Sequence, residues 1–234
     1  RRSHSTGRAF CFVDKQGYRA LYVCPEANLT VTVADLQRGL SSPVEWVHCS
    51  SFAGDAPFAA QRDFVNALSP DLRFSFSPGA LYAARGLAEL RPFLKRCTVL
   101  FLTGAELGAL TGENELLAGA RRLLREGVQT VVVTRGSAGS LVVTQHPDKP
   151  GAGHYEEAAV AAEVVDTTGA GDAFAAGFIL GCLKDWTVVD AQRFAAVVAS
   201  FAVENWGARA GLPSLQQAKE RFEKVFSYPF PEGC

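Results

Sequence analysis

The stretch Asp-Thr-Thr-Gly-Ala-Gly-Asp-Ala-Phe occupies residues 166–174 and governs the interpretation of the whole chain. It follows the apolar pair Val164-Val165, which we expect to belong to a strand, and it leads into a helix predicted to begin near Asp172. Glycines on both sides of Ala170 let consecutive backbone N–H groups point at one spot, and a helix N-terminus adds partial positive charge there. The stretch therefore predicts an anion-binding loop, with Asp172 beside it as a candidate base. In a simpler interpretation the glycines only shape a tight turn before an ordinary helix.

Strand-like and helix-like segments alternate along the chain on both sides of this stretch. Short apolar or β-branched runs predict strands, and apolar residues with helical spacing predict helices. Apolar strands that alternate with helices are typical of a parallel sheet covered on both faces, so we predict a doubly wound α/β fold. The expected strands are residues 46–49, 72–76, 99–102, 128–134 and 140–144, and the expected helices are residues 57–68, 81–94, 115–124, 173–183, 189–205 and 214–226.

The first residues of the chain have a different pattern. Two apolar and aromatic runs, residues 9–13 and 20–23, are separated by the turn-forming tetrapeptide Asp14-Lys15-Gln16-Gly17. This pattern predicts a β-hairpin, and therefore a small β element in front of the α/β domain. A second turn is expected at residues 147–153, which are rich in Gly, Pro and Asp.

Composition limits the class of protein. Of the 234 residues, 48% are hydrophobic and 20% are charged, as in folded globular domains, and the net charge of -1 gives no general attraction to nucleic acid or to an acidic membrane. No apolar stretch reaches the length of a bilayer span, and no secretory signal follows the basic residues 1–8. Six cysteines without a C-x-x-C pair predict reduced thiols in a cytoplasmic protein, and the four histidines lack zinc-ligand spacing.

Residues 166–174 resemble the C-terminal signature of the pfkB carbohydrate kinases, the ribokinase-like family, whose motif reads D-T-x-G-A-G-D. The resemblance implies a ribokinase-like fold and an ATP-dependent kinase that phosphorylates a hydroxyl of a sugar, sugar phosphate or nucleoside. It also implies that Asp172 is the catalytic base and that Gly169, Ala170 and Gly171 form the anion hole for the transferred phosphoryl group. A non-catalytic, nucleotide-binding member of the same fold is the alternative. A Rossmann dehydrogenase is disfavoured, because no G-x-G-x-x-G follows an early strand.

Two further segments follow the family pattern and imply a nucleotide site. Residues 134–140 resemble the T-x-G-x-x-G turn beside the ATP phosphates, which implicates Thr134, Gly136 and Gly139, although a plain turn between strands would look the same. Residues 199–211, including Asn205, resemble the segment that closes over the adenine. The resemblance implies that this segment, together with Asp166 and Thr168, also holds a monovalent cation such as K⁺. Thr168 is assigned to the nucleotide site too.

Residues 103–106, Thr-Gly-Ala-Glu, occupy the place of the family's N-x-x-E motif, which organises Mg²⁺ through water and phosphate. Glu106 matches the motif, whereas Thr103 stands where the family has Asn, so metal organisation is expected to be weaker. The alternative is that Glu106 only lies in the first turn of a helix. Ser77 similarly stands before Pro78 where many members carry an acidic residue.

The resemblance extends from the opening hairpin to the end of the chain. It implies that residues 1–28 form part of a β lid over the acceptor and that residues 29–234 form the nucleotide-binding and catalytic domain. The family's N-terminal strands and its first substrate-binding Asp have no counterpart in the sequence, as expected either of a fragment or of a sequence from which some residues are left out. The resemblance further implies a small-molecule sugar or nucleoside partner, and the exposed face of the lid suggests a homodimer.

Overall fold

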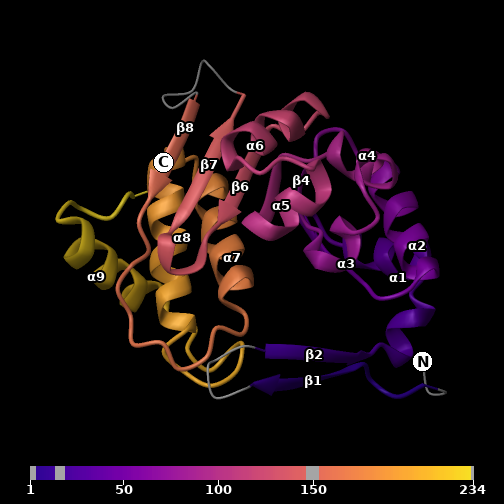
Figure 1. Ribbon diagram of the computed structural model, residues 1–234, viewed down its shortest axis with the longest axis horizontal. Helices are drawn as coiled ribbons and strands as arrows, with labels where there is room; N and C mark the ends of the chain where they lie inside the picture. The colour runs from indigo at the N-terminus through magenta and orange to yellow at the C-terminus, as the bar shows by residue number, and fades with distance from the viewer. Residues whose placement is uncertain (1–3, 14–18, 146–152, 233–234) are drawn as a thin grey trace.

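The computed structural model describes residues 4–13, 19–145 and 153–232, which contain one six-stranded sheet and one two-stranded sheet. The large sheet has the order β3-β4-β5-β6-β7-β8, in which β3 to β6 are parallel while β7 and β8 each run antiparallel to the preceding strand (Figure 1). This mostly parallel sheet confirms the predicted α/β class. The strands are β3 Trp46–Ser50, β4 Arg73–Ser77, β5 Val99–Thr103, β6 Thr130–Thr134, β7 Ser140–Thr144 and β8 Gly153–Glu157.

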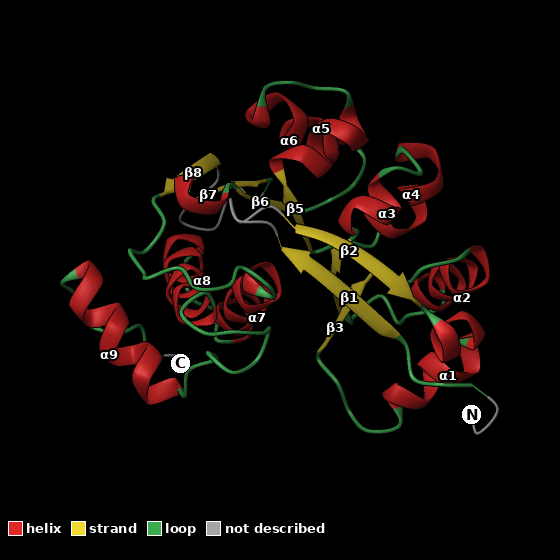
Figure 2. Cartoon of the chain, turned by 60° about the horizontal axis from the view of Figure 1, so that its bottom comes forward, coloured by secondary structure: helices red, strands yellow, loops and turns green. Residues whose placement is uncertain are grey.

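Helices cover both faces of the large sheet (Figures 1 and 2). Alternate residues of β5 show the two layers: Leu100 and Leu102 pack in the core beneath α2 to α6, whereas Val99 and Phe101 pack with α7 and α8. The helix α9 lies outside α8 and adds a smaller aromatic cluster around the buried Phe222. The α-helices are α1 Val33–Gln37, α2 Asp55–Asn66, α3 Gly79–Ala83, α4 Leu87–Leu94, α5 Gly104–Thr111, α6 Leu116–Arg125, α7 Ala170–Leu183, α8 Val188–Ala202 and α9 Leu215–Phe226, and the 3₁₀ turns are η1 Glu26–Thr30, η2 Arg38–Leu40 and η3 Gly136–Ala138.

The structure departs from the sequence-based prediction at several places. The helix expected at residues 81–94 is two helices, α3 and α4, because Gly86 between them has φ +83°, which a helix cannot contain. The pair Val164-Val165 lies in a loop and not in a strand, so the strand predicted before the glycine loop is wrong. The strand β8 and the short helix α1 were not predicted, and α5 was expected only in the alternative interpretation of Glu106. The turn expected at 14–17, and residues 147–152 of the second turn, lie outside the described residues.

The predicted N-terminal hairpin is present as β1 Arg8–Val13 and β2 Arg19–Cys24, which pair antiparallel. It extends from the side of α1 and α2 towards α7 and forms no part of the large sheet (Figures 1 and 2). Phe10, Phe12 and Tyr22 lie on one of its faces and are 49%, 61% and 66% exposed. Within the described ranges, no helix combines the length and the apolar character needed to cross a membrane.

Candidate active site

The direction of α7 places the predicted anion loop at the carboxyl edge of the sheet, the edge where the parallel strands end. Arg73, the first residue of β4, donates from Nη1 to the carbonyl of Cys182 in the last turn of α7, at 3.0 Å. Phe178, one turn earlier, packs in a cluster with Val99, the first residue of β5. The last turn of α7 therefore lies at the amino ends of the strands and its first turn at their carboxyl ends, where open α/β sheets bind ligands.

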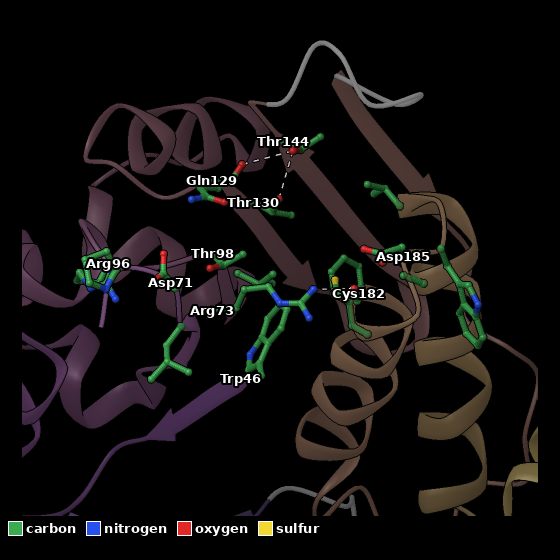
Figure 3. Close-up of a pocket in the computed structure, with 17 residues that line it drawn as sticks. Trp46, Asp71, Arg73, Arg96, Thr98, Gln129, Thr130, Thr144, Cys182 and Asp185 are labelled. Carbon is green, nitrogen blue, oxygen red and sulfur yellow. Dashed lines mark hydrogen bonds between the residues drawn. The ribbon is translucent and has the colours of Figure 1, made fainter. Parts of the chain in front are cut away.

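A cavity of about 350 Å³ lies at the opposite, amino edge of the sheet (Figure 3). Trp46, Arg73, Thr98 and Thr130, all near the starts of strands, line it together with Cys182. Figure 3 shows Arg73 reaching past Trp46 to Cys182, and the Arg73 guanidinium lies 5.0 Å from the centre of the Trp46 ring. None of the predicted site residues is in the lining, so this cavity is separate from the candidate active site.

The first turn of α7 presents backbone amides that no side chain of the helix caps. Gly169 is the N-cap residue and supplies no side-chain hydrogen bond, as glycine must. The amide of Ala170 donates to the Thr167 carbonyl at 3.3 Å, and the next amides, those of Gly171 and Asp172, have no recorded acceptor in the described part of the chain. Gly171 and the carboxylate-bearing Asp172 are both exposed. The arrangement leaves two N–H groups and the helix dipole available to an anion.

Two glycines of the loop are required for different reasons. Gly169 has φ +81°, and a Cβ built there would lie 2.7 Å from Cβ of Ala208, so the local fold needs glycine. Gly171 has an ordinary helical backbone, and a Cβ built there would meet nothing within 4 Å. The protein's own packing therefore does not require glycine at position 171. The open space in front of its amide is instead what close approach of a ligand requires.

The loop before α7 is held by the segment that follows α8. The amides of Val165 and Asp166 both donate to the Val203 carbonyl, at 2.8 and 3.2 Å. The Asp166 carboxylate then joins both sides, because its Oδ1 accepts from the Thr168 amide and its Oδ2 accepts from the Gly207 amide, each at 2.9 Å. Residues 166–169 and 203–208 therefore lie together, as the family resemblance implies for the two sides of the nucleotide and cation sites.

The ends of β5 and β6 add a second group of candidate residues to the same edge. Thr103 and Thr134 are register partners at the last positions of these strands. Thr103 caps α5: its hydroxyl accepts from the Glu106 amide at 3.2 Å, and Oε2 of Glu106 accepts from the Thr103 amide at 2.8 Å. Glu106 is thus in the first turn of a helix, as the simpler interpretation states, while its other carboxylate oxygen has no recorded partner among the described residues.

The turn after β6 contains two glycines with positive φ, Gly136 and Gly139. Gly139 has φ +84°, and a Cβ there would lie 1.9 Å from the carbonyl oxygen of Glu157 in β8, so the pairing of β7 with β8 requires it. Gly136, with φ +58°, is exposed, and a Cβ there would meet nothing within 4 Å. Packing alone therefore explains Gly139, whereas Gly136 faces open space at the carboxyl edge.

A family model for pfkB family carbohydrate kinases matches residues 2–215. The chain belongs to this family. An uncharacterized sugar kinase of Archaeoglobus fulgidus is 34% identical to this pfkB kinase over 211 residues, which are 89% of the chain and 80% of that protein. A nucleoside kinase of Methanothermobacter thermautotrophicus is 31% identical over 228 residues, 97% of the chain and 70% of that protein.

The fold of this pfkB kinase also matches solved structures. A putative ribokinase II of E. coli, solved in complex with ATP and Mg²⁺, superposes with a TM-score of 0.80 at 20% sequence identity, covering 94% of the chain and 71% of that protein. At this identity the likeness shows the ribokinase-like fold. The α/β sheet with an N-terminal two-stranded sheet is therefore the architecture of the family, and the chain is a kinase of the transferase class.

One residue near the candidate catalytic loop of this pfkB kinase was not singled out from the sequence. His48, in β3, lies close enough to Asp172 for the carboxylate to act on its charge: loss of solvent around the ring lowers the pKa of His48, and Asp172 raises it in part. The only signal in the sequence was a polar ring inside the strand predicted at residues 46–49. Its neighbours, Ser75 and Phe101, come from other strands and could not be paired with it beforehand.

Proposed function

We propose that the protein transfers the γ-phosphoryl group of ATP to a hydroxyl of a sugar, a sugar phosphate or a nucleoside. The observation that carries the proposal is the uncapped start of α7, where the Gly171 and Asp172 amides and the Asp172 carboxylate lie exposed at the carboxyl edge of the sheet. An anion hole beside a carboxylate is the arrangement that phosphoryl transfer to an alcohol needs.

In this proposal the residues of the loop have separate roles. Asp172 accepts the proton of the attacking hydroxyl, and Gly169 positions the first amides of α7 by its left-handed backbone. The amides at Ala170, Gly171 and Asp172 donate to the oxygens of the transferred group, with Gly171 leaving room for their approach. Because these N–H donors are fixed in orientation towards the charged oxygens of the transferred group, they stabilise the transition state without rearranging.

The nucleotide is assigned to the two segments around the loop. Thr134, Gly136 and Gly139 line the phosphate side, while Thr168 and Asn205 lie on the adenine side, next to the hydrogen bonds that join residues 166 and 207. For K⁺ at Asp166 the fit is partial, since both carboxylate oxygens already accept amide N–H groups. A cation there would share oxygens that also hold the loop.

Magnesium fits as a metal held chiefly by the nucleotide. In the described ranges, no group of three or more His, Cys, Asp or Glu side chains could hold a metal ion by itself. Mg²⁺ commonly keeps several waters and takes one or two carboxylates beside phosphate oxygens, and the unpartnered oxygen of Glu106 could bind such a water. When bound, Mg²⁺ neutralises charge on the phosphate oxygens. Thr103 offers one hydroxyl, already an acceptor in the α5 cap.

The proposed class of phosphate acceptor is based on the names of two relatives of the chain. One is named a sugar kinase and another a nucleoside kinase, and both align over most of the chain. A sugar and a nucleoside share a ribose-like array of hydroxyls, which the same base and anion hole could serve. We therefore propose a polyhydroxylated acceptor and test both kinds.

The test is a kinase assay with MgATP and a panel containing ribose, inosine and related sugars and nucleosides. Asp172→Asn is expected to lower kcat by about 10²–10⁴-fold, the usual contribution of a general base, while ATP binding measured by calorimetry is retained. Asp185→Asn, at the other end of α7 and in a left-handed conformation that Asn tolerates, is the matched control. Near-wild-type turnover by Asp172→Asn would remove the base assignment. ATP binding without transfer to any acceptor would favour the non-catalytic alternative.

A further inference from the structure

His48 lies on the face of β3 that looks towards α7. Its ring contacts the edge of Phe101 on β5, with ring centres 6.0 Å apart, and Phe101 contacts Phe178 of α7 in the same way at 5.8 Å. Asp172 begins the same helix at the carboxyl edge, and its charge acts on His48. His48 and Asp172 therefore belong to one side of the sheet and to one end of it.

A short chain of hydrogen bonds fixes the chemical form of the His48 ring. Trp46 Nε1, which can only donate, donates to Ser75 Oγ at 2.7 Å, and Ser75 Oγ lies 2.8 Å from His48 Nδ1. Ser75 is fully buried and has no third recorded partner in the described residues, so its O–H can be satisfied only by donating to Nδ1. Nδ1 is then the acceptor, and the ring proton is on Nε2.

The same contacts orient Nε2 of His48 towards the carboxyl edge of the large sheet. Nδ1 faces Ser75 in the middle of β4, while Nε2 lies 3.5 Å from the Ser77 hydroxyl at the last position of that strand. A separation of 3.5 Å makes at most a weak hydrogen bond, so the Nε2–H donor keeps most of its capacity. Nε2 of the neutral ring therefore points along β4 towards the carboxyl edge of the sheet, the edge at which Asp172 also lies.

We propose that His48 is an acceptor-binding residue, which donates its Nε2–H to an oxygen of the sugar or nucleoside while a neighbouring hydroxyl of that molecule faces Asp172. Ser75 is a positioning residue that holds the donor tautomer. The proposal rests on the proposed function, because it needs an acceptor beside Asp172. It goes further than the proposed function because it assigns His48 as a specific hydrogen-bond donor. The sugar or nucleoside must then carry an oxygen next to the hydroxyl that reacts.

The first experiment separates acceptor binding from structure by steady-state kinetics with the panel acceptor that the wild-type enzyme phosphorylates fastest. His48→Leu removes the donor and is expected to raise KM for the acceptor by roughly five- to tenfold, the value of one hydrogen bond, with KM for ATP unchanged. His48→Gln places an N–H donor near the position of Nε2 and should recover most of that loss. An unchanged acceptor KM in His48→Leu, or no recovery in His48→Gln, would overturn the proposal.

A matched pair of variants tests the role of Ser75. Trp46→Phe removes the hydrogen bond from Trp46 to Ser75 and leaves the one between Ser75 and His48, whereas Ser75→Ala removes both, so only Ser75→Ala releases the His48 ring. Ser75→Ala is therefore expected to raise the acceptor KM, and Trp46→Phe to leave it unchanged. Equal effects in the two variants would indicate a purely structural role and count against positioning.

The tautomer itself is measured by nitrogen-15 NMR of the histidine rings at pH 7.5, with His48 assigned from the signal lost in His48→Gln. The expected signature is protonated Nε2 and unprotonated Nδ1, with a shift of Nε2 when inosine or ribose is added. If the wild-type protein phosphorylates nothing in the panel, the proposed function fails for those acceptors, and this measurement still decides the role of His48. A ring protonated at Nδ1, or an Nε2 signal indifferent to both probes, would refute that role.

Discussion

Gly169 lies directly against Ala208, so closely that a single added methyl group would overlap it. This contact joins the loop before α7 to the segment after α8, immediately before the first residue of the helix. Two residues further on, Gly171 has no such neighbour. The fold therefore requires glycine at position 169, whereas at position 171 only a bound ligand would require it. A substitution at 169 should lower stability, and a substitution at 171 should lower activity.

Gly169→Ala should destabilise the protein and Gly171→Ala should not. The first forces a side chain into a left-handed conformation and against Ala208, a loss of about 1–3 kcal/mol or more in the free energy of unfolding. The second removes a flexible residue from a helix, which costs nothing in stability, yet it fills the space before the amides and should reduce kcat/KM at least tenfold. Chemical denaturation and the kinase assay measure the two effects. A Gly171→Ala enzyme with full activity would show that no ligand approaches that amide.

Asp166→Ala should loosen the loop and weaken nucleotide binding. It removes both acceptors that join the Thr168 and Gly207 amides, and hydrogen bonds to a charged group make a net contribution of about 1.5–3 kcal/mol each. Because Asp166 is only half-buried, we expect a net loss near the lower value. Asp166→Asn keeps one acceptor oxygen and is the graded control. Identical unfolding curves for the wild-type protein and both variants would contradict the tether.

Glu106→Gln distinguishes a metal role from a helix cap. Gln completes the same reciprocal capping pattern with Thr103, so the unfolding free energy should stay unchanged. The lost negative charge should nevertheless raise the Mg²⁺ concentration needed for half-maximal activity by several-fold. The titration is run at fixed ATP in the wild-type and variant enzymes. If the two curves coincide, Glu106 serves only to begin α5.

Cysteine labelling should follow burial. Cys49 and Cys97 are buried, and burial raises the pKa of Cys49 to about 11 and that of Cys97 further still, whereas Cys11 is exposed. At pH 8 only about one Cys49 thiol in a thousand would be ionised, and the thiolate is the reactive form. Iodoacetamide followed by peptide mass spectrometry should therefore modify Cys11 quickly, and Cys49 and Cys97 only after unfolding. Comparable rates in the native protein would contradict the described core.

The hairpin should mediate self-association. A two-stranded sheet is marginal by itself, and the exposed aromatic pair Phe12 and Tyr22, with ring centres 5.6 Å apart, offers an apolar face to a second copy. We expect a dimer by light scattering, and a monomer for the double variant Phe12→Ser with Tyr22→Ser. Leu215→Ser, which removes an exposed apolar residue of α9, is the control and should remain dimeric. A monomeric wild-type protein would contradict this prediction.

The parts of the fold that could be predicted are those in which the local sequence of apolar and polar residues shows which side chains are buried. The strands β5 and β6 have uninterrupted apolar centres, Val99 to Leu102 and Val131 to Val133, because helices cover both faces, so their sequences alone identify them. The edge strand β8 was missed because it alternates exposed His154 and Glu156 with half-buried residues and contains no apolar run. The pair Val164-Val165 misled in the opposite direction, since both side chains are apolar yet exposed.

The same distinction applies to the site. The uncapped glycine-rich start of α7, on which the proposed anion loop depends, could be predicted because its residues are consecutive in the chain. The chain of Trp46, Ser75 and His48 could not, because it is assembled across two strands and depends on which hydroxyl is buried. Likewise the joining of Asp166 to Gly207 is a contact over 41 residues, visible in the sequence only through the family resemblance.

The long irregular segment between β8 and α7 has a mechanical consequence. The amides of Val165 and Asp166 donate to the Val203 carbonyl, and the Asp166 carboxylate accepts from the Gly207 amide, so the start of α7 and the chain beyond α8 are bonded to each other. We therefore expect a ligand that displaces one of these segments to displace the other, which would couple the two halves of the proposed nucleotide site.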